Sequence, residues 1–328
     1  MADRPALEVR HLTVSVRLRG GGRAKVVSDA SFTVPPGGTL GIVGESGSGK
    51  TMTSLAIMGL LPRAARVDAG EILLDGEDLL KKSQSEMQKL RGSRIGMVLQ
   101  DPMTALDPCF TVASQLGEPL RQHRGLSGTA LREATVAALE QVQLPAAKDR
   151  LRQYPHQLSG GMRQRVTSAI ALAGQPKVLI ADEPTTALDV TTQARYLQLL
   201  RELQAQNGFA LILVAHDLLV VKHVCSQIVV MYAGEVVEEG PTQNVFSKPQ
   251  HPYTRALIGS IPVLGDSVRL ESIDGQAPDL TEHVPGCRFA ARCKFAREAC
   301  TQAPPPLTPR AGGQLARCFG TEPGGWIQ

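Results

Sequence analysis

Short apolar runs alternate with amphipathic stretches along most of the chain. The runs TLGIV at 39–43, VLIAD at 178–182 and ALILVA at 210–215 have the length and composition of buried strands. Between the last two, DVTTQARYLQLLRELQAQNG has the spacing of an amphipathic helix, with Asp189 to cap its start and Gly208 to end it. Strands that alternate with helices predict a mostly parallel sheet covered on both faces, and therefore an α/β fold.

The same alternation continues up to residue 165 and is lost near residue 240. It predicts strands over 7–43, a turn and helix over 44–60, a strand over 94–100 and helices over 101–165. Residues 241–328 hold 11 of the 22 prolines, and proline removes backbone donors and breaks helices. We therefore predict a large α/β domain over 6–240, with a helical subdomain at about 101–165, and a small loop-rich domain over 241–328.

The composition is that of a globular protein, with 42% apolar and 20% charged residues in a chain of 328. The net charge of +4 is small and aromatic residues make up only 4%, which argues against a nucleic-acid partner. No apolar run approaches the roughly 18 residues that a membrane helix requires. The first residues, MADRPALEVRHL, lack the regions of a secretory signal, so we expect a cytosolic chain with reduced thiols.

The segment from Gly44 to Thr51 is the strongest chemical signal in the chain. It matches the phosphate-binding loop (P-loop) pattern G-x-x-x-x-G-K-[ST], between a predicted strand and a predicted helix. Backbone N–H groups of such a loop surround phosphate oxygens, while Lys50 reaches the β- and γ-phosphates and Thr51 holds Mg²⁺. The predicted nucleotide-binding residues are Gly44, Glu45, Ser46, Gly47, Ser48, Gly49, Lys50 and Thr51.

Two acidic residues close a predicted buried strand. Asp182 and Glu183 follow the run VLIA, and the carboxyl ends of parallel strands meet at the same edge of a sheet as a P-loop. Asp182 suits the Mg²⁺ shell, and Glu183 suits a general base that activates water. His216 follows the run ALILVA and should lie at the same edge, where a lone histidine is more often structural than catalytic.

Together these motifs resemble the ATP-binding subunits of ABC transporters. LSGGMRQR at 158–165 is similar to the family's signature motif, Gln100 to its Q-loop glutamine, Ala187–Asp189 to its D-loop and His216 to its switch histidine. The resemblance implies an ABC-type nucleotide-binding domain of the P-loop NTPase class, with a RecA-like core and a helical subdomain, that hydrolyses ATP. It also implies catalytic roles for Gln100, Glu183 and His216, and Mg²⁺ contacts from Thr51, Gln100 and Asp182.

The signature motif has a physical logic of its own. A P-loop covers one side of the nucleotide, and a second Gly-rich helix start can bind the anion from the other side. In the family this second side comes from a partner subunit, so that ATP joins two subunits. By resemblance, Ser159, Gly160 and Gly161 contact the γ-phosphate that the partner holds.

One departure from the family concerns the adenine base. Members often stack adenine on an aromatic residue upstream of the P-loop, whereas RGGGRAKVVSDASF at 19–32 has no aromatic residue before Phe32. We expect a strand to bury Phe32. A stacked Arg23 or Lys25 side chain is an alternative that the sequence leaves open.

Further motifs resemble the ATPases of dipeptide and oligopeptide importers. They are QDPMTALDP at 100–108, HPYTRAL at 251–257 and a Cys-rich tail. The resemblance implies two membrane permeases, a second related ATPase subunit as heterodimer partner, an external binding protein, and a peripheral position on the cytoplasmic face of the plasma (inner) membrane. Nickel importers share this branch, so nickel or another small solute is the alternative cargo. A soluble regulatory or repair ATPase would require two cassettes or long arms for nucleic acid, and neither is present.

Four of the six cysteines lie in the last 42 residues, at Cys287, Cys293, Cys300 and Cys318. A loop-rich segment with little core needs a staple, although unpaired structural cysteines are the alternative. Cytosolic thiols disfavour disulfides, and zinc sites usually have close C-x₂₋₄-C pairs, which are absent here. Wide, uneven spacing favours a larger iron–sulfur cube.

Basic residues follow the same stretch of sequence and should favour thiolates. They are Arg288, Arg292, Lys294, Arg297 and Arg317. The resemblance points in the same direction, because dipeptide-importer ATPases with this cysteine spacing carry a [4Fe–4S] cluster. We therefore predict one such cluster, with Zn²⁺ as the alternative and a redox role left open.

Overall fold

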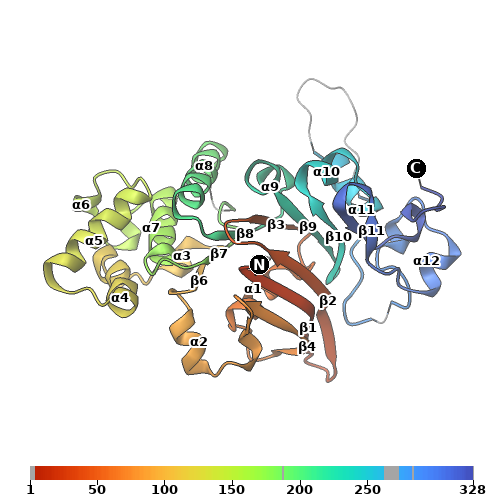
Figure 1. Ribbon diagram of the computed structural model, residues 1–328, viewed down its shortest axis with the longest axis horizontal. Helices are drawn as coiled ribbons and strands as arrows, with labels where there is room; N and C mark the ends of the chain where they lie inside the picture. The colour runs from red at the N-terminus through yellow and green to blue at the C-terminus, as the bar shows by residue number, and fades with distance from the viewer. Residues whose placement is uncertain (1–3, 187, 262–272, 283, 328) are drawn as a thin grey trace. The chain divides into compact units, whose positions relative to one another are not determined.

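The computed structural model describes residues 4–186, 188–261, 273–282 and 284–327 (Figure 1). The chain forms two compact units. Unit 1 contains residues 1–7, 34–39 and 74–214, and unit 2 contains residues 8–33, 40–73 and 215–328. Among the helices described, none is both long and apolar enough to cross a membrane.

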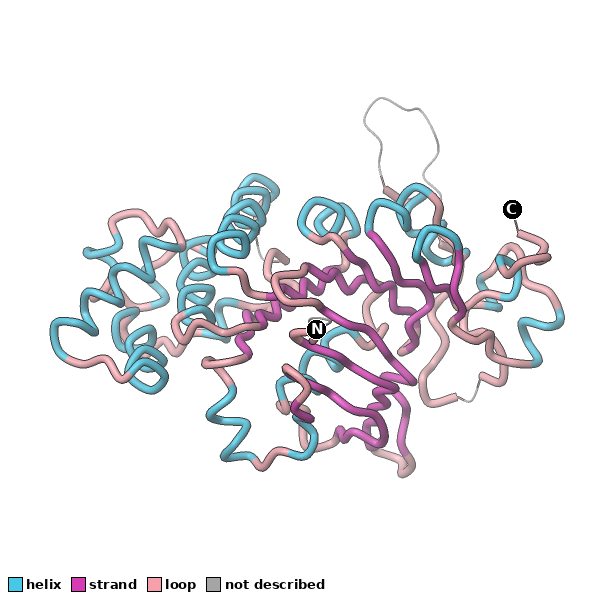
Figure 2. The backbone as a smooth tube through the Cα atoms, in the orientation of Figure 1, coloured by secondary structure: helices cyan, strands magenta, loops and turns pink. Residues whose placement is uncertain are grey.

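Unit 1 is built on parallel strands, with β7 (Val178–Asp182) between β6 (Ile95–Val98) and β8 (Ala210–Ala215) (Figure 2). Val178 pairs with Ile95 on one side and with Ala210 on the other. Every residue of β7 and β8 is buried, so both sequences are unbroken apolar runs rather than alternating ones. The strands expected at 178–182 and 210–215 are confirmed.

Helices make up most of the rest of unit 1. They are α2 (Gln84–Leu90), α3 (Pro102–Ala105), α4 (Val112–Arg124), α5 (Gly128–Gln141), α6 (Ala147–Arg150), α7 (Gly160–Leu172) and α8 (Val190–Asn207), with a short strand β5 (Glu77–Asp78) and 3₁₀ turns at Leu79–Lys81 and Pro155–Gln157. As expected, Asp189 caps α8, and Gly208 ends it in the left-handed conformation. The helical pattern expected from residue 101 is confirmed by α3 to α7 (Figure 1).

The amino-terminal strands of unit 2 form a layer in the order β2 (Arg23–Val34), β1 (Leu7–Arg17), β4 (Ala65–Leu74). The long strands β1 and β2 alternate buried and exposed residues over much of their length, as expected for a sheet with one solvated face. Strand β3 (Thr39–Val43) leads through a Gly-rich turn into α1 (Lys50–Met58). The turn and helix expected over 44–60 are confirmed, with the helix starting at Lys50.

The carboxyl-terminal part of unit 2 adds strands to β3. Strand β9 (Gln227–Tyr232) pairs with β3 in parallel, β10 (Glu235–Pro241) pairs with β9, β12 (Gln314–Ala316) with β10, and β11 (Thr308–Arg310) with β12. The helices of this part are α9 (Leu218–Val224), α10 (Thr242–Ser247), α11 (Pro252–Gly259) and α12 (Glu298–Gln302), with 3₁₀ turns at Ala290–Arg292, Ala311–Gly313 and Phe319–Thr321. The proline-rich tail therefore extends a sheet, which its sequence did not predict.

The tail also shares a buried aromatic cluster with β9. The ring of Phe289 stands edge-on to Tyr232, with centroids 5.2 Å apart, and lies 5.5 Å from Tyr253. Tyr232 and Tyr253 are fully buried. Because aromatic pairs of this geometry stabilise beyond their buried area, the cluster anchors the tail to the sheet of unit 2.

Candidate functional site

The turn between β3 and α1 has a backbone that only glycine adopts easily. Gly44, Gly47 and Gly49 have φ values of 154°, 79° and 99°. A Cβ on Gly44 would lie 2.1 Å from the carbonyl oxygen of Met231, so a side chain there is excluded by contact as well. The glycines therefore let the loop wrap closely before α1 begins.

Lys50 opens α1 and is turned back onto this loop. Its side chain is buried, and its Nζ donates to the carbonyl oxygens of Gly44 (2.8 Å) and Glu45 (3.0 Å). Thr51 follows in the first turn of α1. The ammonium group is thus held over the loop whose N–H groups would surround a phosphate.

The carboxyl end of β7 in unit 1 carries the predicted acidic pair. Asp182 is 2% exposed. Glu183 has a φ of 43°, which is uncommon for a residue with a side chain and typical of functional sites. Its Oε2 accepts hydrogen bonds from Gln100 Nε2 (3.0 Å) and Thr186 Oγ1 (3.2 Å), so the structure brings the predicted Q-loop glutamine to the predicted base.

The signature motif lies where α7 begins. Ser159 is the N-cap, and its Oγ accepts the N–H of Met162 at 3.3 Å. Gly160 and Gly161 form the first turn, and a Cβ on Gly161 would meet Thr192 of α8 at 2.8 Å. The helix N-terminus, with its free N–H groups, is the kind of end that binds anions.

The D-loop precedes α8. Ala187 lies outside the described residues, and the N–H of Leu188 donates to Thr185 O at 3.0 Å. Asp189 accepts from both the N–H (3.0 Å) and the Oγ1 (2.7 Å) of Thr192, and these hydrogen bonds lower the pKa of its carboxyl. Asp189 therefore acts here as a helix cap.

The remaining predicted residue, His216, is exposed and directly follows β8, at the start of the part of the chain that returns to unit 2. The P-loop belongs to unit 2 as well. Gln100, Ser159, Asp182 and Glu183 belong to unit 1. Unit 1 thus contains the predicted base, the Q-loop glutamine and the signature motif, with Gln100 in contact with Glu183, and unit 2 contains the P-loop and His216.

The residues upstream of the P-loop that were considered for stacking on adenine have different surroundings. Phe32 is buried, as expected. Arg23 donates from Nε to Ser15 Oγ (2.7 Å) and from Nη2 to Ser15 O (2.8 Å), so its guanidinium is held against its own sheet. Lys25 is exposed on β2. Of the two alternatives, only Lys25 has a side chain that is open to solvent.

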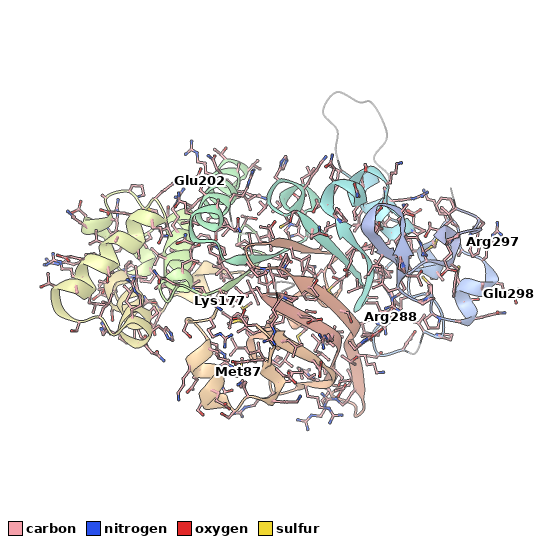
Figure 3. All side chains as sticks on the ribbon, viewed as in Figure 1. Met87, Lys177, Glu202, Arg288, Arg297 and Glu298 are labelled. Atoms are coloured by element: carbon pink, nitrogen blue, oxygen red, sulfur yellow. The ribbon has the colours of Figure 1, made fainter. Side chains whose placement is uncertain are left out.

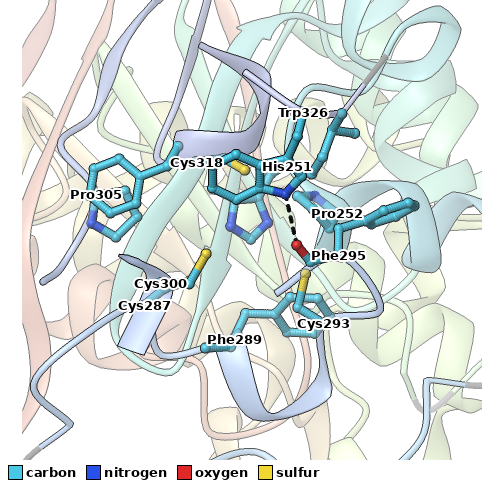
Figure 4. Close-up of a pocket in the computed structure, with 13 residues that line it drawn as sticks. His251, Pro252, Cys287, Phe289, Cys293, Phe295, Cys300, Pro305, Cys318 and Trp326 are labelled. Atoms are coloured by element: carbon cyan, nitrogen blue, oxygen red, sulfur yellow. Dashed lines mark hydrogen bonds between the residues drawn. The ribbon is translucent and has the colours of Figure 1, made fainter. Parts of the chain in front are cut away.

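The four tail cysteines line a single cavity of about 20 Å³ (Figure 4). Its other walls are mostly apolar, and Trp326 closes one side by donating its indole N–H to Phe295 O at 2.9 Å. The Cys287 N–H donates to Cys300 O at 2.7 Å, which ties two of the cysteine segments together. Within the described ranges, no group of three or more His, Cys, Asp or Glu side chains is arranged to hold a metal ion.

Three basic residues of the tail contact groups other than the thiols. Arg288 pairs with Glu235 (3.1 Å), Arg297 lies 4.5 Å from the ring centre of Trp326, and Arg317 pairs with Asp29 (3.6 Å). Arg288 and Arg297 are labelled in Figure 3. Burial, followed by the neighbouring cysteines, raises the pKa of the Cys287 thiol to about 12. At Cys287, burial therefore outweighs the expected effect of the basic residues in favour of a thiolate.

The sequence HPYTRAL contributes residues that sequence reasoning did not place in the site. His251 caps α11, and its Nδ1 accepts the N–H of Tyr253 at 3.1 Å. Complete burial, aided by the charge of Arg317, lowers the pKa of His251 to about 3, so this histidine is neutral. The hydroxyl of Tyr253 accepts the backbone N–H of Glu45 in the P-loop at 2.9 Å. The HPYTRAL motif thus contacts the P-loop through Tyr253.

A glycine-rich turn before α1 and an acidic strand end with an oriented glutamate are the features of a P-loop ATPase. The model of the ABC transporter family matches residues 27–186, and that of the oligopeptide/dipeptide transporter C-terminal region matches residues 237–300. The chain is 47% identical to a peptide import ATP-binding protein of Brucella ovis, over 97% of this chain and 98% of that one. It is 45% identical to another of Brucella abortus, over 96% and 94%.

Solved structures agree. A dimeric ATP-binding cassette in a post-hydrolysis state, bound to ADP and Pi, is 29% identical with a TM-score of 0.65, covering 72% of this chain and 98% of that one. The protein cbiO1 of Clostridium perfringens, part of an ABC transporter complex, is 28% identical with a TM-score of 0.64, covering 75% and 92%. The chain belongs to the ATP-binding subunits of ABC transporters, in the branch with the oligopeptide/dipeptide transporter C-terminal region. It is an ATPase of a family that uses Mg²⁺ and works with membrane permeases.

Proposed function

We propose that this ATPase powers the import of dipeptides and oligopeptides through a membrane transporter. The observation that carries the proposal is that one chain combines a P-loop ATPase with a tail that matches the oligopeptide/dipeptide transporter C-terminal region. The names of the Brucella relatives, which match over nearly the full length, support the same cargo. Nickel or another small solute is the outcome that would replace it.

In the proposed reaction, water attacks the γ-phosphorus of ATP and the bond to the β-phosphate oxygen breaks. Glu183 takes the proton of the attacking water, oriented by the hydrogen bonds from Gln100 and Thr186 to its Oε2. Lys50 would exchange its present carbonyl acceptors for β- and γ-phosphate oxygens. Bound Mg²⁺ would offset the phosphate charge. Thr51, Gln100 and Asp182 are its proposed contacts, and His216 is proposed to sense the γ-phosphate.

We further propose that the catalytic assembly contains two ATPase subunits. The N–H groups at the start of α7, with Ser159, Gly160 and Gly161, would contact the nucleotide held by a related but different partner ATPase. Two permeases and an external binding protein complete the proposed transporter, at which this chain lies peripherally on the cytoplasmic face of the inner membrane. The ATPase domain is proposed to span 6–240, with its helical subdomain at about 101–165, and the tail domain 241–328.

For the tail we propose a [4Fe–4S] cluster held by Cys287, Cys293, Cys300 and Cys318, with a single Zn²⁺ as the alternative. Four thiols that line one cavity with mostly apolar walls supply the number and kind of ligands that such a cluster requires. This donor set carries the proposal rather than the volume of the cavity. The cluster would supply a covalent link among three tail segments.

Transport measurements on the assembled transporter in vesicles test the proposed function. Dipeptide should stimulate both ATP hydrolysis and its own uptake, whereas nickel should do neither. The Glu183→Gln variant should lose hydrolysis by a factor of about 10²–10⁴, the usual contribution of a general base, while it still binds ATP. Glu202→Gln on α8, where Glu202 accepts hydrogen bonds from Gln143 and Gln198, is the matched control and should stay active.

Two results would contradict these proposals separately. Uptake of nickel without uptake of any peptide would overturn the cargo. Hydrolysis near the wild-type rate in Glu183→Gln would overturn the role of Glu183 but leave the cargo untouched.

A further inference from the structure

An ion pair joins the cysteine-containing tail to the P-loop. Arg292 Nη1 lies 2.9 Å from Glu45 Oε2, and Arg292 Nη2 lies 3.2 Å from Glu45 Oε1, so the two planar groups meet through two parallel hydrogen bonds. The Arg292 side chain is only 7% exposed. Paired hydrogen bonds between a guanidinium and a carboxylate are strong and directional, and limited exposure to water protects them from screening.

Arg292 is itself fixed on its other sides. Its Nη1 also donates to the hydroxyl of Tyr232 (3.2 Å), and its Nε donates to the carbonyl oxygen of Asp274 (2.9 Å). Its guanidinium lies 5.7 Å from the ring centre of Tyr232. These contacts do not involve Glu45, and they orient the guanidinium independently of it. Arg292 can therefore fix the position of the Glu45 side chain.

Glu45 is held at its backbone as well. The hydroxyl of Tyr253 accepts the Glu45 N–H at 2.9 Å, and the Glu45 carbonyl accepts Lys50 Nζ at 3.0 Å. Arg292 and Tyr253 of the tail therefore hold the second residue of the P-loop at its side chain and at its backbone, and Lys50 bonds to the same residue. A shift of Glu45 would move both the loop and the group that is proposed to bind the β- and γ-phosphates.

The segment that supplies Arg292 is bounded by two of the tail cysteines. We call residues 287–293 the cysteine loop. It contains a 3₁₀ turn at Ala290–Arg292, and Phe289 packs on Tyr232 and Tyr253, the two tyrosines whose hydroxyls bond to Arg292 and Glu45. The fold of this loop thus determines where the guanidinium stands.

We propose that Arg292 is a positioning residue for ATP binding, through which the cysteine loop sets the conformation of the P-loop. It does not touch the nucleotide and acts through Glu45. The inference rests on the proposed role of residues 44–51 as the phosphate-binding loop. It gives the tail a second role beyond the transporter assembly, because ATP affinity depends on the tail of the same chain.

Binding of a Mg²⁺–ATP analogue to the full chain tests this inference. Arg292→Gln should weaken binding about threefold to tenfold, in the range found for residues that affect a site without contacting its ligand. Arg292→Lys keeps the charge but loses the paired geometry, so it should restore part of the affinity. Glu45→Gln should weaken binding similarly, and the double variant should be no weaker than either single one, because both substitutions remove the same interaction.

Arg310→Gln is the matched control. Arg310 is also a buried tail arginine, and it donates to Thr308 Oγ1 (2.6 Å) and Cys318 O (2.8 Å) but not to the P-loop. Its loss should leave ATP affinity within about twofold of wild type. Equal weakening in Arg310→Gln and Arg292→Gln would show a general effect of the tail and overturn the proposal, as would additive effects of Arg292→Gln and Glu45→Gln.

Lys50→Ala separates this inference from the assignment of the P-loop. If Lys50→Ala abolishes binding while Arg292→Gln does not change it, the P-loop assignment stands and the positioning role of Arg292 fails. If Lys50→Ala binds the analogue normally, the P-loop assignment itself fails.

Discussion

Neighbouring carboxylates on β10 have opposite surroundings. Glu238 is fully buried and accepts hydrogen bonds from the N–H groups of Gln250 (2.7 Å) and His251 (2.8 Å). Glu239, the next residue, is largely buried, and its Oε2 has no hydrogen-bond partner among the described residues. Burial raises the pKa of Glu239 to about 7. One carboxylate therefore organises α11, while the other is a source of pH-dependent stability.

We predict that Glu239→Gln stabilises the chain at pH 8 and changes little at pH 4. The Glu239 carboxyl ionises near pH 4.5 in the unfolded chain but only near pH 7 in the folded one, so unfolding is favoured increasingly as pH rises through this window. Gln carries no charge, and at pH 8 it should raise the free energy of unfolding by about 1–3 kcal/mol. Urea unfolding at the two pH values measures this.

Glu238→Gln is the comparison for that measurement. Both carboxylate oxygens of Glu238 accept backbone N–H groups, and in Gln one of these oxygens is replaced by an NH₂ group that cannot accept. Glu238→Gln should therefore destabilise the chain at both pH values. A loss of stability in Glu239→Gln at pH 8 would show that the Glu239 carboxylate has a favourable partner.

At the residue level, the sequence predicted the groups that belong to a local pattern. Gly44 to Thr51 and the pair Asp182–Glu183 are recognisable because their chemistry requires fixed spacing beside a strand. The pair formed by Glu45 and Arg292 is separated by 247 positions and belongs to no repeat or motif. Only the packing of Phe289 on Tyr232 and Tyr253 brings these two side chains together, so the contact could not be predicted from the sequence.

Among the elements, buried strands with sharp boundaries were predicted best. β7 and β8 have the expected bounds because both are continuous apolar runs, apart from Asp182 at the end of β7. β11 and β12 were missed because each has only three residues. β12 forms by pairing with β10, and β11 by pairing with β12. In such strands tertiary pairing rather than local propensity decides the structure.

Helix α7 gives a prediction at this level. We expect Ser159→Arg to abolish hydrolysis at the composite site that holds the partner's nucleotide, because a long cation would occupy the helix start where the γ-phosphate is proposed to bind. ATP binding to this chain's own P-loop should stay within about twofold. Hydrolysis by the assembled transporter and analogue binding to the isolated chain measure the two effects.

Thr111→Arg is the control for the loss of the helix cap that Ser159→Arg also causes. Thr111 caps α4 as Ser159 caps α7, and both hydroxyls accept an N–H at 3.3 Å. Each substitution should cost about 0.5–2 kcal/mol of stability, but only Ser159→Arg should stop hydrolysis. If Ser159→Arg instead removed ATP binding from the isolated chain, the signature motif would act within its own chain and not on the partner.

For the molecule as a whole, the sequence predicted the α/β fold of the cassette, but it predicted the tail as an appendage. The composition of 241–328 indicated few helices and little core, because prolines interrupt both. It could not show that Gln314–Ala316 would pair with β10 or that Phe289 would join a buried cluster with Tyr232. The tail is thus continuous with the sheet of unit 2, and the proposed role of Arg292 implies that a change at the cysteines would alter the P-loop.

We predict that the proposed iron–sulfur cluster is lost when one of its four ligands is replaced, because all four thiols line the same cavity. Protein purified without oxygen should be brown and contain about four irons and four sulfides per chain. Cys293→Ser should lose the colour, speed proteolysis within 284–327 and weaken analogue binding by a factor similar to that of Arg292→Gln, since Cys293 adjoins Arg292. Cys109→Ser, at an exposed cysteine of unit 1, should retain iron, resistance and affinity. A colourless wild-type protein with one zinc would contradict the cluster. If Cys293→Ser were free of iron and sensitive to protease but bound the ATP analogue as tightly as wild type, the cysteine loop would hold Arg292 in place without the cluster.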